Sequence, residues 1–313
     1  MISRKMVACF VTFLACGVLV VSDQAWCEQE NEKSLLIDGA NPTYGDVVYG
    51  EASGKELKLD VYKAESDKPT PAVIYIHGGG WNHGNKRKGM PGFLFDELVP
   101  SGITVVSISY RFSPVDPHPA QVNDATRAVQ FVRHKAKEWN IDEKRIGFVG
   151  MSAGAHVALW VGFHDNAAKP DSKDPVEKES SKVACIVNMS GPADFFLLRK
   201  HNIVSKAFPM LLGLKPDAHP SDFSDKAIEA VSPVTYISAD DPPVLGFYGG
   251  VDPVVPRENG EILHGKLRLS GVESKVVYVE EAKHNTWNFD ITRKESVAFL
   301  KKQLKVANKT EDK

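Results

Sequence analysis

The chain has 313 residues with 38 lysines and arginines, 40 aspartates and glutamates, and a formal net charge of −2. It therefore lacks the basic excess that nucleic-acid binding requires. Apolar residues at 42% and charged residues at 25% are ordinary for a globular protein and exclude a disordered chain. Four cysteines are too few for a disulfide scaffold, and the length allows one large α/β domain or two small ones.

Residues 1–27 have the pattern of a secretory signal peptide. Two basic residues precede an apolar run over 6–21, and small or polar residues follow it up to Cys27. The run is shorter than the roughly 20 residues of a membrane-spanning helix, although an uncleaved anchor and cleavage after Ser22 stay open. We expect a secreted or periplasmic protein without stable membrane association after cleavage. Its remaining cysteine, Cys185, is expected to be buried on a strand and to form no disulfide.

The rest of the chain alternates strand and helix patterns. Residues 55–63 alternate polar and apolar side chains, as in a half-exposed strand. Short unbroken runs rich in valine and isoleucine predict strands buried on both faces of a parallel sheet: 72–76, 103–108, 146–149, 184–187, 244–248 and 276–279. One apolar stripe predicts a long helix over 119–139. Three further segments have helical patterns: 153–164, 257–269 and 295–304.

This alternation predicts a single doubly wound α/β domain over residues 28–306, with helices on both faces of a mostly parallel sheet. The polar stretch 166–182 is expected to be a surface loop. The insertion 192–233 is rich in phenylalanine and leucine and is too long for a structureless loop, so we expect a helical cap or lid. Residues 307–313 are expected to form a flexible tail.

A nucleophile is predicted at Ser152. The segment 150–154 reads Gly-Met-Ser-Ala-Gly, follows a predicted buried strand and opens a predicted helix. A sharp strand-to-helix turn needs neighbours without bulky side chains, and glycines two residues to either side leave the serine hydroxyl exposed. The structural alternative is a serine that caps the helix.

An oxyanion-binding loop is predicted at residues 77–81, His-Gly-Gly-Gly-Trp, directly after the strand 72–76. Three consecutive glycines leave backbone N–H groups unshielded, and the tetrahedral intermediate of ester hydrolysis needs such donors. A flexible turn is the alternative. A phosphate-binding loop is not expected, because no Lys-Ser or Lys-Thr pair follows and no helix begins there.

The serine needs a base and the base needs an orienting acid. Of the ten histidines, His264 and His284 lie late enough in the chain for the order serine, acid, histidine. His284 follows the strand 276–279 through a short loop and is preferred, because His264 lies within a helical pattern. Asp252 follows the strand 244–248 and is preferred as the acid over Asp240 and Asp241, which precede that strand.

Three further side chains lie near these residues in the sequence. Trp81 and Trp287 flank the predicted site, where they either stack on a sugar ring or an aromatic acyl group or simply pack. His156 follows the predicted nucleophile by one helical turn and is expected to support it by packing or capping.

Taken together, these motifs resemble an α/β-hydrolase of the esterase and lipase group. The resemblance covers nearly all of residues 45–306. Within this group, the chain is similar to bacterial secreted carboxylesterases related to feruloyl and acetyl-xylan esterases. It departs from hormone-sensitive-lipase-type members at 252–256, which read Asp-Pro-Val-Val-Pro. The resemblance implies Ser152 as nucleophile, His284 as base and Asp252 as its partner. It also implies oxyanion N–H groups from Gly79, Gly80 and Ala153.

The implied function is a secreted serine esterase that works through an acyl-enzyme, without a cofactor or a metal ion. The expected partner is a small-molecule or carbohydrate ester, such as an acetylated or feruloylated polysaccharide, and not a nucleic acid. Two alternatives stay open. One is an amidohydrolase of the kynurenine-formamidase type, and the other is a non-catalytic binding protein on a hydrolase fold.

Overall fold

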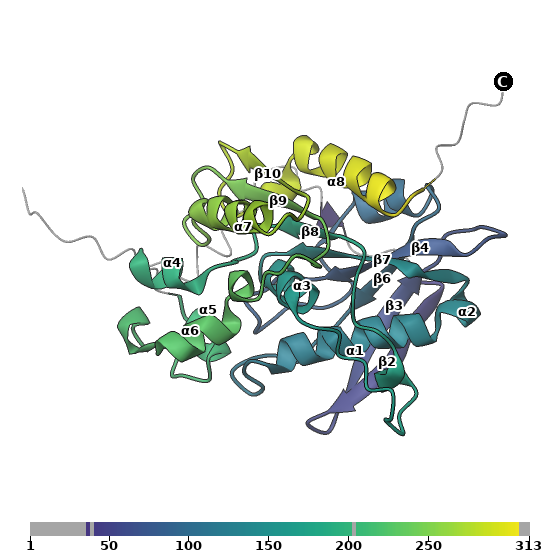
Figure 1. Cartoon of the computed structure of the whole chain (residues 1–313), viewed down its shortest axis with the longest axis horizontal. Helices are drawn as coiled ribbons and strands as arrows, with labels where there is room; N and C mark the ends of the chain where they lie inside the picture. The colour runs from purple at the N-terminus through teal and green to yellow at the C-terminus, as the bar shows by residue number, and fades with distance from the viewer. Residues whose placement is uncertain (1–35, 38–40, 202–204, 307–313) are drawn as a thin grey trace, which may run out of the picture.

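A computed structural model describes residues 36–37, 41–201 and 205–306 (Figure 1). The predicted signal peptide (1–27) and tail (307–313) lie outside the described residues. The main sheet is built from β2 (Tyr44–Ala52), β3 (Lys55–Tyr62), β4 (Thr70–Ile76), β6 (Thr104–Ile108), β7 (Ile141–Met151), β8 (Ile186–Met189), β9 (Val244–Gly249) and β10 (Ser274–Val279). A separate antiparallel pair joins β1 (Leu36–Ile37) to β5 (Met90–Pro91).

The sheet has eight strands in the order β10-β9-β8-β7-β4-β6-β3-β2. The six strands β10, β9, β8, β7, β4 and β6 pair in parallel with their neighbours. The strand β3 is antiparallel to both of its neighbours, β6 and β2. A mostly parallel sheet with helices on both faces is therefore confirmed. Because the parallel strands share one direction, the loops that follow β4, β7, β9 and β10 meet at the same edge.

The helices are α1 (Ala120–His134), α2 (Ala136–Trp139), α3 (Ala153–Phe163), α4 (Phe195–Lys200), α5 (Ala207–Leu211), α6 (Asp225–Val231), α7 (Glu258–Leu269) and α8 (Asp290–Gln303). Shorter helical turns are η2 (Leu94–Leu98), η3 (Val176–Lys178), η4 (Pro220–Asp222), η5 (Pro233–Thr235) and η6 (Thr286–Asn288). Among the described residues, no helix has both the length and the apolar character that crossing a membrane requires.

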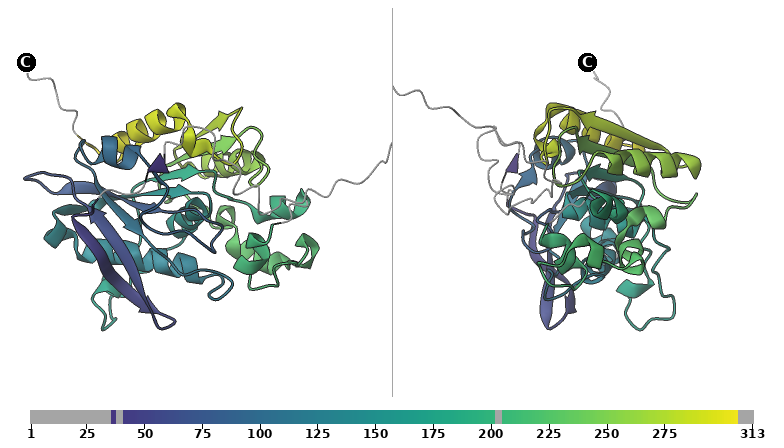
Figure 2. Two further views of the ribbon diagram at one scale, coloured as in Figure 1. Left: turned by 180° about the vertical axis from the view of Figure 1, so that it is seen from behind. Right: turned by 90° about the vertical axis from the view of Figure 1, so that its left-hand side faces the viewer.

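Two apolar layers enclose the sheet, since successive strand residues point to opposite faces. In β4, Ile74 and Ile76 belong to the layer that α1, α3 and α7 cover. Val73 and Tyr75 belong to the opposite layer, which η2 and α8 cover. The yellow helix α8 lies at the top of Figure 1 and of the left view of Figure 2, well separated from α1 and α3.

The structure differs from the sequence predictions in three places. The run 276–279 predicts a strand buried on both faces, but β10 lies at the edge of the sheet and Val279 is its only buried residue. The edge strand β2 is not among the predicted strands, because most of its residues are exposed and it has no apolar run. Two register shifts interrupt its pairing with β3. The single helix expected over 119–139 is divided at Lys135, where ψ is −1°, into α1 and the one-turn helix α2. Asn140 ends α2 in the left-handed region with φ of 56°.

The predicted insertion 192–233 contains α4, α5, η4 and α6. These green helices gather at one side of the molecule in Figure 1 and in the left view of Figure 2. Their core is apolar, with Phe195, Phe208 and Ile228 all buried. The role of this insertion as a lid stays a prediction.

Candidate active site

Three polar side chains meet where neighbouring parallel strands end. Ser152 follows β7, Asp252 follows β9 and His284 follows β10. The Ser152 Oγ lies 2.7 Å from His284 Nε2, and His284 Nδ1 lies 2.8 Å from Asp252 Oδ2. Because a carboxylate only accepts, Nδ1 carries the proton and Nε2 turns its lone pair to the serine hydroxyl. This arrangement can remove a proton from Ser152 and hold the resulting imidazolium.

The backbone at Ser152 explains why glycines surround it. Ser152 has φ of 51° and ψ of −121°, a strained conformation for a residue with a side chain. A Cβ atom at Gly150 would lie 2.4 Å from the Ala155 Cα, and one at Gly154 would lie 2.1 Å from the Ile76 carbonyl oxygen. Neither distance is tolerable, so both positions must be glycine for the turn to close against β4.

Asp252 is held rigidly behind the histidine. Its Oδ1 accepts hydrogen bonds from the backbone N–H groups of Val254 at 2.8 Å and Val255 at 2.9 Å. Its side chain is fully buried. The two carboxylate oxygens therefore bond to different groups. Oδ1 holds the loop after β9, and Oδ2 orients His284.

The rival acids and the rival base lie elsewhere. Asp240 forms an ion pair with Lys182 at 3.2 Å, and Asp241 accepts from the backbone N–H of Ser238 at 2.8 Å. His264 bonds through Nδ1 to the Ser274 hydroxyl at 2.8 Å. The structure thus brings Asp252 and His284 to Ser152 and leaves these three residues outside the site.

The glycine loop after β4 passes directly over Ser152. A Cβ atom at Gly78 would lie 3.3 Å from the Ser152 Cβ. Gly79 and Gly80 both have positive φ, 111° and 54°. A Cβ at Gly79 would lie 2.2 Å from the His83 carbonyl oxygen, so only glycine fits there. On the other side of the serine, Ala153 is the first residue of α3, where helix N–H groups have no intrahelical partner.

The two tryptophans differ in their surroundings. Trp81 is 2% exposed and packs against His156, Phe195 and Phe208, at ring distances of 5.2, 6.0 and 5.6 Å. The structure therefore favours the packing role for Trp81 over stacking on a substrate. Trp287 is 9% exposed and meets the His284 ring edge to face at 5.5 Å.

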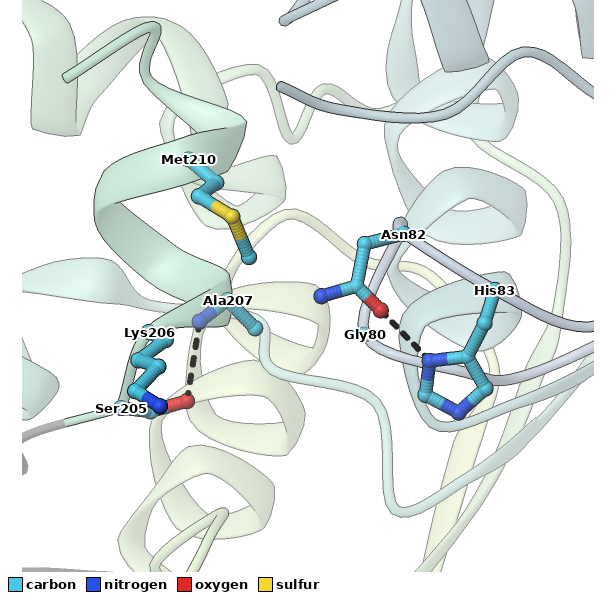
Figure 3. A pocket seen from close by; sticks show the side chains of 7 residues that line it. All are labelled: Gly80, Asn82, His83, Ser205, Lys206, Ala207 and Met210. Atoms are coloured by element: carbon cyan, nitrogen blue, oxygen red, sulfur yellow. Dashed lines mark hydrogen bonds between the residues drawn. The ribbon is translucent and has the colours of Figure 1, made fainter. Parts of the chain in front are cut away.

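A cleft of about 320 Å³ adjoins the glycine loop (Figure 3). Gly80, Asn82 and His83 form one wall, and residues just before and within α5 form the other: Ser205, Lys206, Ala207 and Met210. In Figure 3 the Asn82 amide and the Met210 thioether project toward each other across it. No sequence pattern predicts this cleft, because its two walls are about 120 residues apart in the chain.

Asn82 also lines a second cleft of about 470 Å³. Its other walls come from the start of β3 and from the loop after β6, and they comprise Lys55, Glu56, Leu57, Ser109, Tyr110, Arg111, Phe112, Ser113, Pro114 and Val115. Neither cleft is lined by Ser152 or His284, which are 4% and 7% exposed. The reacting atoms are thus nearly enclosed, with open space on the outer side of the glycine loop.

Three histidines are held in their neutral form by burial: His77 and His156 are buried, and His118 is half-buried. Burial lowers the pKa of His77 to about 4, of His118 to about 4 and of His156 to about 3. In an unfolded chain each would titrate near its ordinary value of about 6.5. The unfolded state therefore binds more protons as the pH falls below about 6.5, and the folded state loses stability.

We expect the free energy of unfolding to fall between about pH 7 and about pH 5, by on the order of 1–2 kcal/mol for each of the three histidines. Urea unfolding followed by circular dichroism at the two pH values measures this difference. The control is the slope of the unfolding free energy against urea concentration. Equal slopes at the two pH values mean that unfolding exposes the same amount of surface. An unfolding free energy that is unchanged or larger at about pH 5 would contradict the expected burial of neutral histidines.

The described part of the chain also includes the predicted lone cysteine and the polar stretch 166–182. Cys185 is buried and free, and burial raises the pKa of its thiol to about 12. Over residues 36–37, 41–201 and 205–306, no three His, Cys, Asp or Glu side chains lie together so that they could hold a metal ion. The stretch 166–182 is irregular apart from η3 and lies against α1, where Arg127 pairs with Asp174 at 2.6 Å.

The chain is similar to a known protein family and to curated proteins. The BD-FAE family model matches residues 59–267. A curated protein of Mycobacterium tuberculosis, named "Probable carboxylic ester hydrolase LipM", is 31% identical over 242 residues, which cover 75% of this chain and 54% of LipM. The chain thus spans about half the length of such curated relatives.

Two solved structures extend the comparison. The acetyl ester-xyloside bifunctional hydrolase from Caldicellulosiruptor lactoaceticus has a TM-score of 0.68 and 26% identity, covering 85% of this chain and 95% of that one. A truncated carbohydrate esterase from gut microbiota has a TM-score of 0.74 over 86% of this chain and 100% of its own. Its identity of 24% makes it evidence for the fold alone.

Proposed function

Because the chain belongs to the BD-FAE family and has the α/β-hydrolase fold, we propose that it is a carboxylic ester hydrolase that works through an acyl-enzyme on Ser152. The observation that carries this proposal is the hydrogen-bonded series from Ser152 through His284 to Asp252. A serine hydroxyl alone is a weak nucleophile at neutral pH, and a neutral imidazole with a fixed tautomer supplies the base that it needs.

In the proposed acylation step, the Ser152 Oγ attacks the ester carbonyl carbon while His284 Nε2 takes the hydroxyl proton. The carbonyl π electrons move to the oxygen, which becomes the oxyanion of a tetrahedral intermediate. Collapse of this intermediate breaks the bond to the alcohol, and His284 gives its proton to the leaving oxygen. Asp252 stays ionised and stabilises the imidazolium that forms between the two proton transfers.

Deacylation repeats these roles with water as the nucleophile. His284 takes a proton from the water, the hydroxide adds to the acyl carbonyl, and the carboxylic acid leaves as Ser152 regains its proton. In both steps we assign the oxyanion to the backbone N–H groups of Gly79, Gly80 and Ala153. Support comes from the contact of the glycine loop with Ser152 and from the free helix end at Ala153.

We infer that the ester is small on its acyl side and hydroxylated on its alcohol side. Ser152 and His284 are almost enclosed, which favours a short acyl group. The cleft beside Gly80 combines the polar groups of Asn82 and Ser205 with the apolar Met210. A sugar ring has hydroxyl groups on its rim and apolar faces, so it matches such a lining. The Caldicellulosiruptor lactoaceticus enzyme, which is 26% identical, is named as an acetyl ester-xyloside bifunctional hydrolase.

Secretion is part of the proposal and is supported by the pattern of residues 1–27 alone. A carbohydrate ester outside the cell would be a substrate that an exported esterase can reach. The test is the location of the mature protein when the full chain is produced in a bacterium, with its N-terminus determined by mass spectrometry. A chain that keeps residues 1–27 and stays with the membrane would replace secretion by anchoring.

The proposed function is tested with a panel of substrates for the purified protein. We expect hydrolysis of p-nitrophenyl acetate and of acetylated xylo-oligosaccharides, with kcat/KM for the octanoate lower than for the acetate by at least about 10-fold because the site is enclosed. Methyl ferulate tests an aromatic acyl group, and p-nitroacetanilide tests the amide that matches p-nitrophenyl acetate.

Two outcomes would contradict the proposed function. Faster cleavage of N-formylkynurenine or the anilide than of every ester would favour the amidohydrolase. A folded protein without activity would favour the binding protein.

A further inference from the structure

The glycine loop has a conformation that its own residues do not favour. Trp81 follows Gly79 and Gly80 and has φ of 59°, so three consecutive residues lie at positive φ. Glycine tolerates this region, but a tryptophan there is strained and needs surrounding contacts to hold it. The Trp81 carbonyl oxygen accepts from the Ser113 backbone N–H at 2.9 Å. The Trp81 side chain supplies the second anchor.

That anchor is His156, on the first turns of α3. The Trp81 Nε1–H donates to His156 Nδ1 at 3.1 Å, with the two rings edge to face. The His156 backbone N–H donates to the Ser152 carbonyl oxygen at 3.1 Å. One histidine thus joins the loop over the nucleophile to the helix that begins beside the nucleophile.

The same imidazole contacts the insertion. His156 Nε2 lies 2.7 Å from the Val231 carbonyl oxygen at the end of α6, and the ring meets Phe195 of α4 at 5.1 Å. The carbonyl oxygen can only accept, so Nε2 carries the proton and Nδ1 presents the lone pair that Trp81 requires. Both ring nitrogens are used, and the ring is fully buried. Burial also lowers its pKa to about 3, so the ring stays neutral across the neutral pH range, and the two hydrogen bonds set its tautomer.

We propose that His156 is a positioning residue that fixes the oxyanion loop relative to Ser152 and couples that loop to helices α4–α6. The proposal rests on the proposed esterase function. The ring of His156 bonds to Trp81 and Val231, so it acts through the orientation of Trp81 and hence of Gly79 and Gly80. Displacing the oxyanion donors slows the chemical steps more than it weakens substrate binding, because these donors contact the charge that develops in the transition state.

Three conservative variants separate the two hydrogen bonds. Trp81→Phe keeps a ring but removes the N–H that His156 accepts. His156→Asn places an oxygen near the former Nδ1 and loses the donor to Val231, whereas His156→Gln places its amide near the former Nε2 and loses the acceptor for Trp81. Trp160→Phe is the matched control. Its indole N–H, also from α3, donates to the Ala230 carbonyl oxygen at 2.9 Å and has no part in the loop.

Each variant is compared with the unchanged protein by kcat and KM for p-nitrophenyl acetate, per active site titrated with an organophosphate. Trp81→Phe and His156→Gln are expected to lower kcat by about 10- to 100-fold with KM within about 3-fold. Affinity for a boronic acid, which forms a tetrahedral adduct on the serine, should fall in proportion. His156→Asn should lose less of kcat, and Trp160→Phe should stay within about 2-fold. The double variant Trp81→Phe/His156→Gln should be no slower than His156→Gln alone, because both changes break the same hydrogen bond between Trp81 and His156.

A lower melting temperature with unchanged kcat per titrated site in Trp81→Phe and His156→Gln would overturn the proposal and leave a purely structural contact. The unchanged protein supplies a further test. The ¹⁵N shifts of the His156 ring must identify a proton on Nε2 and a bare Nδ1, and the opposite tautomer would overturn the proposal even if a variant misfolds. An unchanged protein that hydrolyses no ester would instead count against the proposed function, so the two failures are distinguishable.

Discussion

Ser152→Ala is expected to lower kcat for p-nitrophenyl acetate by on the order of 10⁵–10⁶-fold. The Oγ that lies 2.7 Å from His284 Nε2 is the atom that forms the acyl bond, and no other hydroxyl can replace it at the same point of the turn. The turn itself should persist, because its geometry depends on Gly150 and Gly154 and on the bond from the Ser152 N–H to the Met189 carbonyl oxygen. Steady-state kinetics, with circular dichroism as the check on folding, measures the loss.

A matched control is available at Ser190. It also follows a buried strand, has φ of 53° and is fully buried, but its hydroxyl bonds to the Thr286 hydroxyl at 2.8 Å. Ser190→Ala removes one buried hydrogen bond of ordinary strength, so a loss of no more than about 10-fold is expected. Equal losses in both serine variants would refute the assignment of Ser152 as nucleophile. An acyl adduct found by mass spectrometry in the unchanged protein and absent from Ser152→Ala would support it independently.

Asp252→Asn is expected to lower kcat by about 10⁴-fold while the fold is kept. The two backbone N–H groups of Val254 and Val255 donate to Oδ1, so an asparagine must present its carbonyl oxygen to them and its NH₂ group to His284. His284 would then have to accept at Nδ1, which puts the proton on Nε2. An imidazole with a proton on Nε2 cannot accept one from Ser152, so the base is lost through its tautomer.

Asp240→Asn is the control for Asp252→Asn. It removes the same charge from an exposed carboxylate that pairs with Lys182, and exposed pairs contribute little, so turnover close to that of the unchanged protein is expected. Kinetics over the neutral and alkaline range, together with thermal unfolding of both variants, completes the comparison. Near-normal turnover in Asp252→Asn would mean that His284 is oriented by another acceptor, and the mechanism would have to be revised at that point.

Local rules of sequence predicted the framework well. The runs at 72–76, 146–149 and 244–248 lie within β4, β7 and β9, because a strand buried on both faces requires consecutive apolar side chains. The positions of Ser152, Asp252 and His284 follow from the same rule, since each lies within a few residues of the end of a strand that composition predicts. The edge strand β2 escaped notice because exposed strands carry no such constraint.

The steric requirement at the nucleophile turn is equally local. The glycines at 150 and 154 were expected because a sharp turn excludes side chains, and the structure supplies the atoms that they avoid, the Ala155 Cα and the Ile76 carbonyl oxygen. The break of the long helix at Lys135 has no such signal. Its apolar stripe continues to Trp139, and the interruption at ψ of −1° is visible only in the folded backbone.

The sequence by itself therefore determined the order of strands and helices, the class of fold and the residues to consider for chemistry, because these depend on neighbours within a few positions along the chain. Tertiary structure alone decided the rest. It formed the hydrogen bonds that join Ser152, His284 and Asp252. It also formed the cleft between Asn82 and α5, and joined Trp81 through His156 to Val231. Those relations hold between residues about 30 to 130 positions apart, where hydrogen-bond partners are set by the packing of strands and helices and leave no periodic trace in the sequence.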